Sequence, residues 1–275
     1  MLPTLYISHG SPMLAIEDGV GRAFLRSLGV LLPRPRAILC ITAHWETDQP
    51  CLSSAAQPQT IHDFLGFPPA LYRLRYPAPG APDLARRAAH LLGVAGLAVR
   101  SDEQRGLDHG TWSALSLAYP EADVPVVQLS VQNARDGRHH LQVGRALRPL
   151  RAEGVLILGS GSAVHNLREL ARGRDAPVAD WAQAFDDWLA ARVTAGDLAA
   201  LADYRRLAPQ AARAPERGAL SSHPGRRRRG RGRTGASALP RHRQGRLVDV
   251  GLSLRPAGLE PPPLAAYTAG PGGSA

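Results

Sequence analysis

The sequence predicts a single α/β domain, in which helices flank both faces of a central and mostly parallel β-sheet. Three observations support this prediction. Short apolar segments alternate with helical patterns over residues 1–205, which is the order of a layered α/β domain. The short segments are rich in Ile, Leu and Val, as the buried strands of a parallel sheet are. The chain has 275 residues, 44% of them hydrophobic, which suffices for one sizeable core.

Four segments have the composition of buried strands, and five segments show helical patterns. The predicted strands cover residues 5–8, 37–43, 124–131 and 155–159. The predicted helices cover residues 20–32, 82–97, 111–119, 137–152 and 178–194. The second of these helices begins with Pro82 and Asp83, which are favoured in a first helical turn. The last helix carries large apolar side chains on one face, which predicts a buried stripe: Trp181, Phe185, Trp188 and Leu189.

The net charge of +10 is concentrated near the C-terminus. Residues 1–213 carry 22 Arg and 20 acidic residues, whereas residues 214–275 carry 11 Arg and 3 acidic residues. We therefore divide the chain into a nearly neutral main domain over 1–213 and an Arg-, Gly- and Pro-rich tail over 214–275, predicted to be disordered. Such a tail would bind nucleic acid without sequence preference. No aromatic residues are interleaved with its Arg residues to stack on bases, which argues against a nucleic-acid partner.

Several classes of protein are excluded by what the sequence lacks. No apolar run approaches the roughly 20 residues that span a bilayer, and the N-terminus does not resemble a secretory signal. The two cysteines, Cys40 and Cys51, make neither a disulfide framework nor a zinc ribbon. Cys40 lies inside a predicted strand, where a small buried hydrophobic residue is expected. We expect a cytoplasmic protein without a membrane partner.

Three histidines are placed just beyond predicted strands. His9 follows LYIS, His44 follows ILCITA and His165 follows VLILGSGSAV. Open α/β sheets bind ligands at the carboxyl ends of their strands. We therefore expect these imidazoles, which come from distant segments, to converge on a metal or acid–base site.

Two further histidines lie in predicted loops, and each has two interpretations. In GLDHGTW, His109 either donates a hydrogen bond to an anionic oxygen at a helix N-terminus or is merely exposed beside Asp108, which caps the helix. His62 and Asp63 belong to the Pro-rich segment 46–80, which is predicted to be an irregular functional loop. They either line a pocket or cap a turn.

Seven motifs occur in order along residues 1 to about 213: SHGSPM, TAHWET, TIHDFLGFP, YPAPG, GLDHGTW, VPVVQLS and GSGSAVHNL. Together they resemble the DODA-type extradiol aromatic ring-opening dioxygenases of the class III, or LigB-like, superfamily. The resemblance implies one α/β domain with one divalent metal ion, either Zn²⁺ or Fe²⁺. It also implies that the substrates are O₂ and a small aromatic diol such as a DOPA-like catechol.

The resemblance also assigns roles to individual residues. His9 and His44 resemble the metal ligands. His165 resembles the histidine that serves as general base or as an additional metal ligand, and His109 the one that steadies substrate or oxygen. Two residues correspond to substrate-binding positions: His62 and Trp45. Such a site suits the chemistry, because a metal held on one face leaves room for both catechol oxygens and O₂. A nearby imidazole can take a catechol proton and later return it.

The C-terminal region departs from the family pattern. The family has its third metal ligand in a stretch resembling HPSEEHFLPIL and closes with a strand resembling LSMSAYRF, and neither is present. The codons that can encode residues 214–225 can also encode the first stretch when they are read one base later. The same shift around residues 248–254 allows the second. We therefore interpret the sequence from about Ala214 onward as translated out of frame, through a frameshift or a sequencing error.

A genuine tail would have a different consequence. The codon of the third ligand would straddle Ala219 and Leu220, and His223 would be the nearest replacement. The chain would then be a catalytically impaired member of the family, because a missing ligand weakens metal binding.

Overall fold

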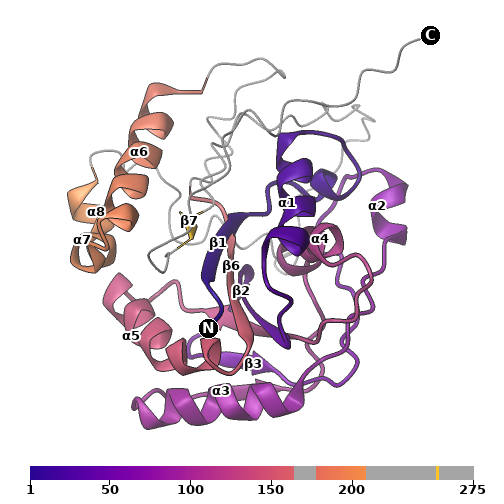
Figure 1. Ribbon diagram of the computed structural model, residues 1–275, viewed down its shortest axis with the longest axis horizontal. Helices are drawn as coiled ribbons and strands as arrows, with labels where there is room; N and C mark the ends of the chain where they lie inside the picture. The colour runs from indigo at the N-terminus through magenta and orange to yellow at the C-terminus, as the bar shows by residue number, and fades with distance from the viewer. Residues whose placement is uncertain (164–177, 209–251, 254–275) are drawn as a thin grey trace, which may run out of the picture.

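A mixed β-sheet forms the centre of the molecule (Figure 1). The computed structural model describes residues 1–163, 178–208 and 252–253. Within these residues the sheet has seven strands in the order β4-β3-β5-β2-β6-β1-β7. The strands are β1 Thr4–Ser8, β2 Ala37–Glu46, β3 Cys51–Ser53, β4 Arg100–Asp102, β5 Val126–Val131, β6 Val155–Gly161 and β7 Leu252–Ser253.

Most neighbouring strands of this sheet are parallel. The pairs β1–β6, β2–β6, β2–β5 and β3–β4 run parallel, and the pairs β3–β5 and β1–β7 run antiparallel. In the central strands, Ile38 of β2 pairs with Leu156 on one side and with Val126 on the other. The sheet confirms the mostly parallel arrangement predicted from the apolar segments. Strands β5, β2, β6 and β1 place their carboxyl ends at a common edge, because they are parallel.

Helices cover both faces of the sheet (Figure 1). On one face lie α1 (Val20–Leu31), α2 (Pro69–Arg73), α4 (His109–Ala118) and the 3₁₀ helix η1 (Pro12–Ala15). On the other lie α3 (Pro82–Val94), α5 (Gly137–Leu147) and the 3₁₀ helix η2 (Arg148–Arg151). Strand β2 serves both cores, because its side chains alternate: Ile38 and Cys40 face the first, and Ala37 and Leu39 the second. This two-faced burial explains why the first five residues of the strand, Ala37–Ile41, are all apolar.

A smaller cluster forms from α6 (Asp180–Thr194), α7 (Leu198–Ala202) and α8 (Tyr204–Leu207). Phe185 is buried there, and Trp188, Leu189 and Tyr204 pack around it. The predicted buried stripe of α6 is therefore confirmed only for Phe185, because Trp181, Trp188 and Leu189 are half-buried. Among the helices of the described residues, none is long and apolar enough to cross a membrane.

The structure corrects several predicted boundaries. Strand β2 continues to Glu46, so His44 lies within the strand and not beyond it. The pairing register of β2 with β5 shifts between Ile41 and Glu46, which marks an irregular stretch around His44. Helix α4 begins two residues earlier than predicted, at His109. The predicted helix over 137–152 divides into α5 and η2, where Pro149 follows the end of α5.

The segment 46–80 is not irregular throughout. It contains the short strand β3 and the five-residue helix α2, which were not predicted. The predicted tail over 214–275 lies outside the described residues, apart from the two residues of β7. The division of the chain at residue 213 therefore stays a prediction.

Candidate metal centre

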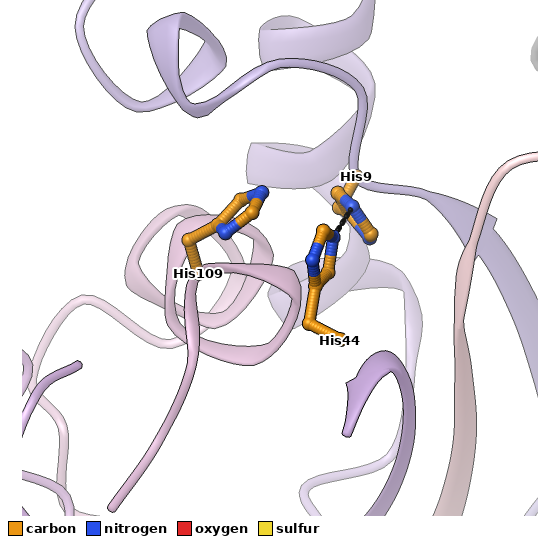
Figure 2. A group of neighbouring side chains, drawn as sticks. All are labelled: His9, His44 and His109. Carbon is orange, nitrogen blue, oxygen red and sulfur yellow. Dashed lines mark hydrogen bonds between the residues drawn. The ribbon is translucent and has the colours of Figure 1, made fainter. Parts of the chain in front are cut away.

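Three imidazoles meet at the carboxyl edge of the sheet (Figure 2). His9 directly follows β1, His44 lies near the end of β2, and His109 is the first residue of α4. Each of the three residues offers one ring nitrogen, and these three nitrogens all lie within 4.8 Å of one another. His9 and His109 are each 5% exposed, and His44 is half-buried. A buried cluster of three imidazoles is a donor set that binds divalent metal ions.

The hydrogen bonds of Ser160 define which nitrogen of His9 carries a proton. Ser160 Oγ lies 3.0 Å from His9 Nδ1 and donates its own proton to the carbonyl oxygen of Gly110. Because a hydroxyl has only one proton, Ser160 Oγ accepts from His9 Nδ1–H. The lone pair of His9 is therefore on Nε2.

Asp63 has the same effect on the other two histidines. Its Oδ1 accepts from His109 Nδ1 at 2.8 Å and from the backbone amide of His109 at 3.0 Å, and its Oδ2 lies 3.5 Å from His44 Nδ1. Burial raises the pKa of this carboxyl, but two hydrogen bonds from His109 and the positive charge that His109 and His44 can carry outweigh burial and lower the pKa to about 2. The ionised carboxylate only accepts hydrogen bonds, so Nδ1 is the protonated nitrogen of His109. The 3.5 Å contact with Oδ2 places the same carboxylate beside Nδ1 of His44.

The nitrogens of His9 and His44 have the spacing of two ligands of one ion. His9 Nε2 and His44 Nε2 are 2.9 Å apart (Figure 2). A hydrogen bond at this distance requires a proton on one of the two Nε2 atoms. A cation bound by both nitrogens would take the place of that proton. Two nitrogens bound to one ion at about 2.0–2.1 Å are about 2.9 Å apart at an N–metal–N angle of about 90° and about 3.3 Å apart at a tetrahedral angle. The observed separation therefore fits a shared divalent ion.

Asp108 positions the helix that carries His109. Its Oδ1 accepts from Thr42 Oγ1 of β2 at 2.9 Å and from the amide of Thr111 at 3.2 Å, which caps α4. Its Oδ2 accepts from Gln128 Nε2 of β5 at 2.7 Å. The interpretation of Asp108 as a cap is thus confirmed. The companion interpretation of His109 as merely exposed is wrong, because its side chain is buried and its ring centroid lies 3.9 Å from that of His44.

Gly110 permits the close approach of α4 to β2. A Cβ atom at this position would lie 2.7 Å from Thr42 Oγ1 and 2.8 Å from His44 Cδ2. Both separations are shorter than real Cβ contacts, so a side chain here would force the helix and the strand apart.

The two predicted substrate-binding residues lie outside the three-histidine cluster. His62 contacts the carbonyl oxygen of Leu74 at 3.0 Å through Nε2. Its ring packs against Phe64, which in turn meets the ring of His109 edge-on with centroids 5.6 Å apart. Trp45 is buried beneath the guanidinium of Arg105, at 4.9 Å from its ring centroid. Their contacts with substrate stay predictions.

The remaining candidates are not placed by the structure. His165 and His223 lie outside the described residues. Their roles as base, ligand or replacement ligand stay predictions.

Two functional residues were not identified from the sequence. Asp63 was considered only as a pocket or turn residue, although it contacts two members of the cluster. Ser160 belongs to GSGSAVHNL, a motif from which only the histidine was selected. Two serines just beyond the predicted apolar strand, Ser160 and Ser162, were the available signal.

The chain matches the family described as the catalytic LigB subunit of aromatic ring-opening dioxygenase over residues 3–223. A protein named 4,5-DOPA dioxygenase extradiol from Beta vulgaris is 50% identical over 210 residues, which cover 75% of this chain and 78% of that protein. A protein of the same name from Escherichia coli (strain K12) is 43% identical over 194 residues, covering 70% and 71%. The crystal structure of an uncharacterized protein from Escherichia coli K12 superposes with a TM-score of 0.63 at 35% identity, covering 76% of this chain and 83% of that one.

Proposed function

The chain belongs to the LigB family of aromatic ring-opening dioxygenases and is an extradiol enzyme by that membership, and we propose that its substrate is a small DOPA-like catechol. The names of its relatives support this substrate class. The observation that carries the proposal is the 2.9 Å approach of His9 Nε2 to His44 Nε2, which suits a shared metal ion at the edge where α/β sheets bind ligands.

We assign His9 and His44 as metal ligands, with His109 beside them. An all-imidazole set suits both Zn²⁺ and Fe²⁺, and we propose Fe²⁺ as the ion of the active enzyme. When bound, this ion would supply positive charge that favours the ionised catechol and the redox chemistry that O₂ requires. A single ion held from one side would leave space for the diol and for O₂.

The protein side chains would bind the substrate and manage its protons. The Nδ1–H group of His109 donates to Asp63, so Nε2 of His109 is the atom that would face a substrate or oxygen atom. His165 would take a proton from a catechol hydroxyl and return it to the opened ring. His62 and Trp45 would contact the substrate, and Phe64 would help to exclude water, because its ring packs beside His109.

Anaerobic reconstitution with Fe²⁺, followed by O₂ and a panel of catechols, tests this function. We expect uptake of O₂ together with the yellow absorbance of a ring-opened product for a DOPA-like member of the panel. The Zn²⁺-loaded chain serves as the control, because Zn²⁺ has no redox chemistry. Bound Fe²⁺ without O₂ uptake for any catechol would contradict the proposal. Cytoplasmic location remains a prediction of the sequence.

A further inference from the structure

A single carboxylate contacts two of the three clustered imidazoles. Asp63 Oδ1 binds His109, and Asp63 Oδ2 lies beside His44 Nδ1. We propose that Asp63 is a positioning residue that holds both rings in one tautomer and one orientation, so that Nε2 of each faces the metal site. This inference rests on the proposed metal-dependent function.

The chemistry of imidazole explains why such a residue matters. A neutral imidazole can carry its proton on either nitrogen, and the hydrogen bond to one nitrogen determines which lone pair is presented. Carboxylates commonly fix metal-binding histidines in this way, and losing one typically weakens metal binding about 10- to 100-fold. Here one carboxylate serves two rings whose centroids are only 3.9 Å apart. A change at Asp63 should therefore disturb both rings together.

The anchoring of Asp63 is independent of the rings it orients. Ile61, two residues before Asp63, is held through both of its backbone polar groups: its amide donates to Leu107 O at 2.7 Å, and its carbonyl accepts from Trp112 Nε1 at 2.8 Å. The loop would thus stay in place without the carboxylate. Helix α4 also keeps its own cap, because Asp108 accepts from the amide of Thr111.

These contacts separate a positioning role from a structural one. A residue that only tied the loop to α4 would need its two bonds to His109 and nothing more. The second oxygen beside His44, which belongs to a different element, has no part in such a tie. We therefore expect the main consequence of losing Asp63 to appear at the imidazoles and not in the fold.

Asp63→Asn in the full chain is the informative variant, because it preserves shape and removes one acceptor. The amide oxygen can accept from one Nδ1–H, but the NH₂ group then faces the other Nδ1–H, so one ring must turn or change tautomer. In the metal-free chain we expect imidazole ¹⁵N spectra to show Nδ1–H tautomers for His44 and His109 in the wild type and a change in at least one of them in the variant. Competition titrations should show Zn²⁺ binding about 10- to 100-fold weaker.

Asp136→Asn is the matched control. Asp136 caps α5 by accepting from the amide of His139 at 3.0 Å, and it does not contact the cluster. We expect this variant to leave the tautomers of His44 and His109 and the affinity for Zn²⁺ unchanged. Asp63→Asn should retain the circular dichroism spectrum of the wild type and melt within a few degrees of it.

Unchanged tautomers and unchanged Zn²⁺ affinity in Asp63→Asn would overturn the inference. So would a loss of Zn²⁺ binding that accompanies a comparable loss of helical signal, because the role would then be structural. The proposed function fails separately. If no catechol is opened but the tautomers and the Zn²⁺ affinity change as expected, the positioning role stands.

Discussion

His9 and His44 approach each other to 2.9 Å between their Nε2 atoms, although 35 positions separate them in the sequence. Ser160 Oγ accepts from His9 Nδ1, and Asp63 Oδ2 lies 3.5 Å from His44 Nδ1. The Nε2 atoms are thus the nitrogens that face each other, and a cation bound by both would take the place of a shared proton. The hydrogen bonds around the rings thus identify the site more specifically than the presence of histidines does.

We expect His9→Ala to weaken Zn²⁺ binding by about 100-fold or more, since a ligand is removed and not merely misoriented. A chromophoric chelator competing for Zn²⁺ measures the change. His90→Ala is the matched control, because His90 is exposed on α3. Equal affinities of the two variants would exclude His9 from the ligand set.

Gly110→Ala should separate α4 from β2, because the new methyl group would meet Thr42 and His44. We expect a loss of about 1–3 kcal/mol in the free energy of unfolding, together with weaker Zn²⁺ binding. Urea denaturation and the Zn²⁺ titration report the two effects. Gly93→Ala in α3, where a Cβ meets no atom within 4 Å, should be neutral or slightly stabilising. A Gly110→Ala chain as stable as this control would contradict the close packing.

His165→Ala should retain metal and lose at least about 100-fold in turnover, if His165 acts as the general base. Metal content and O₂ uptake are measured on the same preparation. Loss of the metal would instead make His165 a ligand.

The stability of the α6 region should depend on pH through Asp186. Burial and the neighbouring Asp187 raise the pKa of Asp186 to about 6. A carboxyl whose pKa is higher in the folded state stabilises the fold when protonated, and this contribution is lost as pH rises through about 6. Asp186→Asn should therefore raise the free energy of unfolding by about 1 kcal/mol at pH 8, allowing for solvent screening, and by nearly nothing at pH 4. Denaturation at the two pH values checks the sign; equal effects would contradict it.

Resequencing across the codons for residues 205–225 tests the reading frame. We expect a single-base insertion or deletion near codon 213, and a corrected frame that encodes HPSEEHFLPIL. The corrected chain should bind Zn²⁺ at least about 10-fold more tightly, because it regains a ligand. An intact frame ending in PGGSA would make the tail genuine and favour a catalytically impaired chain. The family match itself ends at residue 223.

The central strands and most helices could be predicted because each carries its signal locally. Strand β2 begins with five consecutive apolar residues, Ala37–Ile41, because it serves two cores, and this run is visible in the sequence. Strands β3 and β4 were missed because three residues are too few to show a period. The continuation of β2 through His44 was missed because the register shift there disrupts the alternation.

The candidate site was predictable only in its histidines. His9 and His44 follow apolar strand segments, so their convergence follows from the parallel sheet. The contact of Asp63 with His109 joins residues 46 positions apart, and no local pattern reports it. The burial of His109 likewise depends on how α4 packs against β2. The GLDHGTW motif alone therefore did not decide whether His109 is exposed or belongs to the site.

Because of the strand order, the three-histidine cluster can form only late in the synthesis of the chain. Strands β1 and β2, which carry two of the histidines, are not neighbours; β6 lies between them and brings Ser160 to His9. A nascent chain that leaves the ribosome without residues 155–161 already holds His9, His44 and His109 but has no strand to set their spacing. Metal capture should therefore follow the insertion of β6, and free imidazoles earlier in synthesis would offer the cell's metal pool only weak, unorganised ligands.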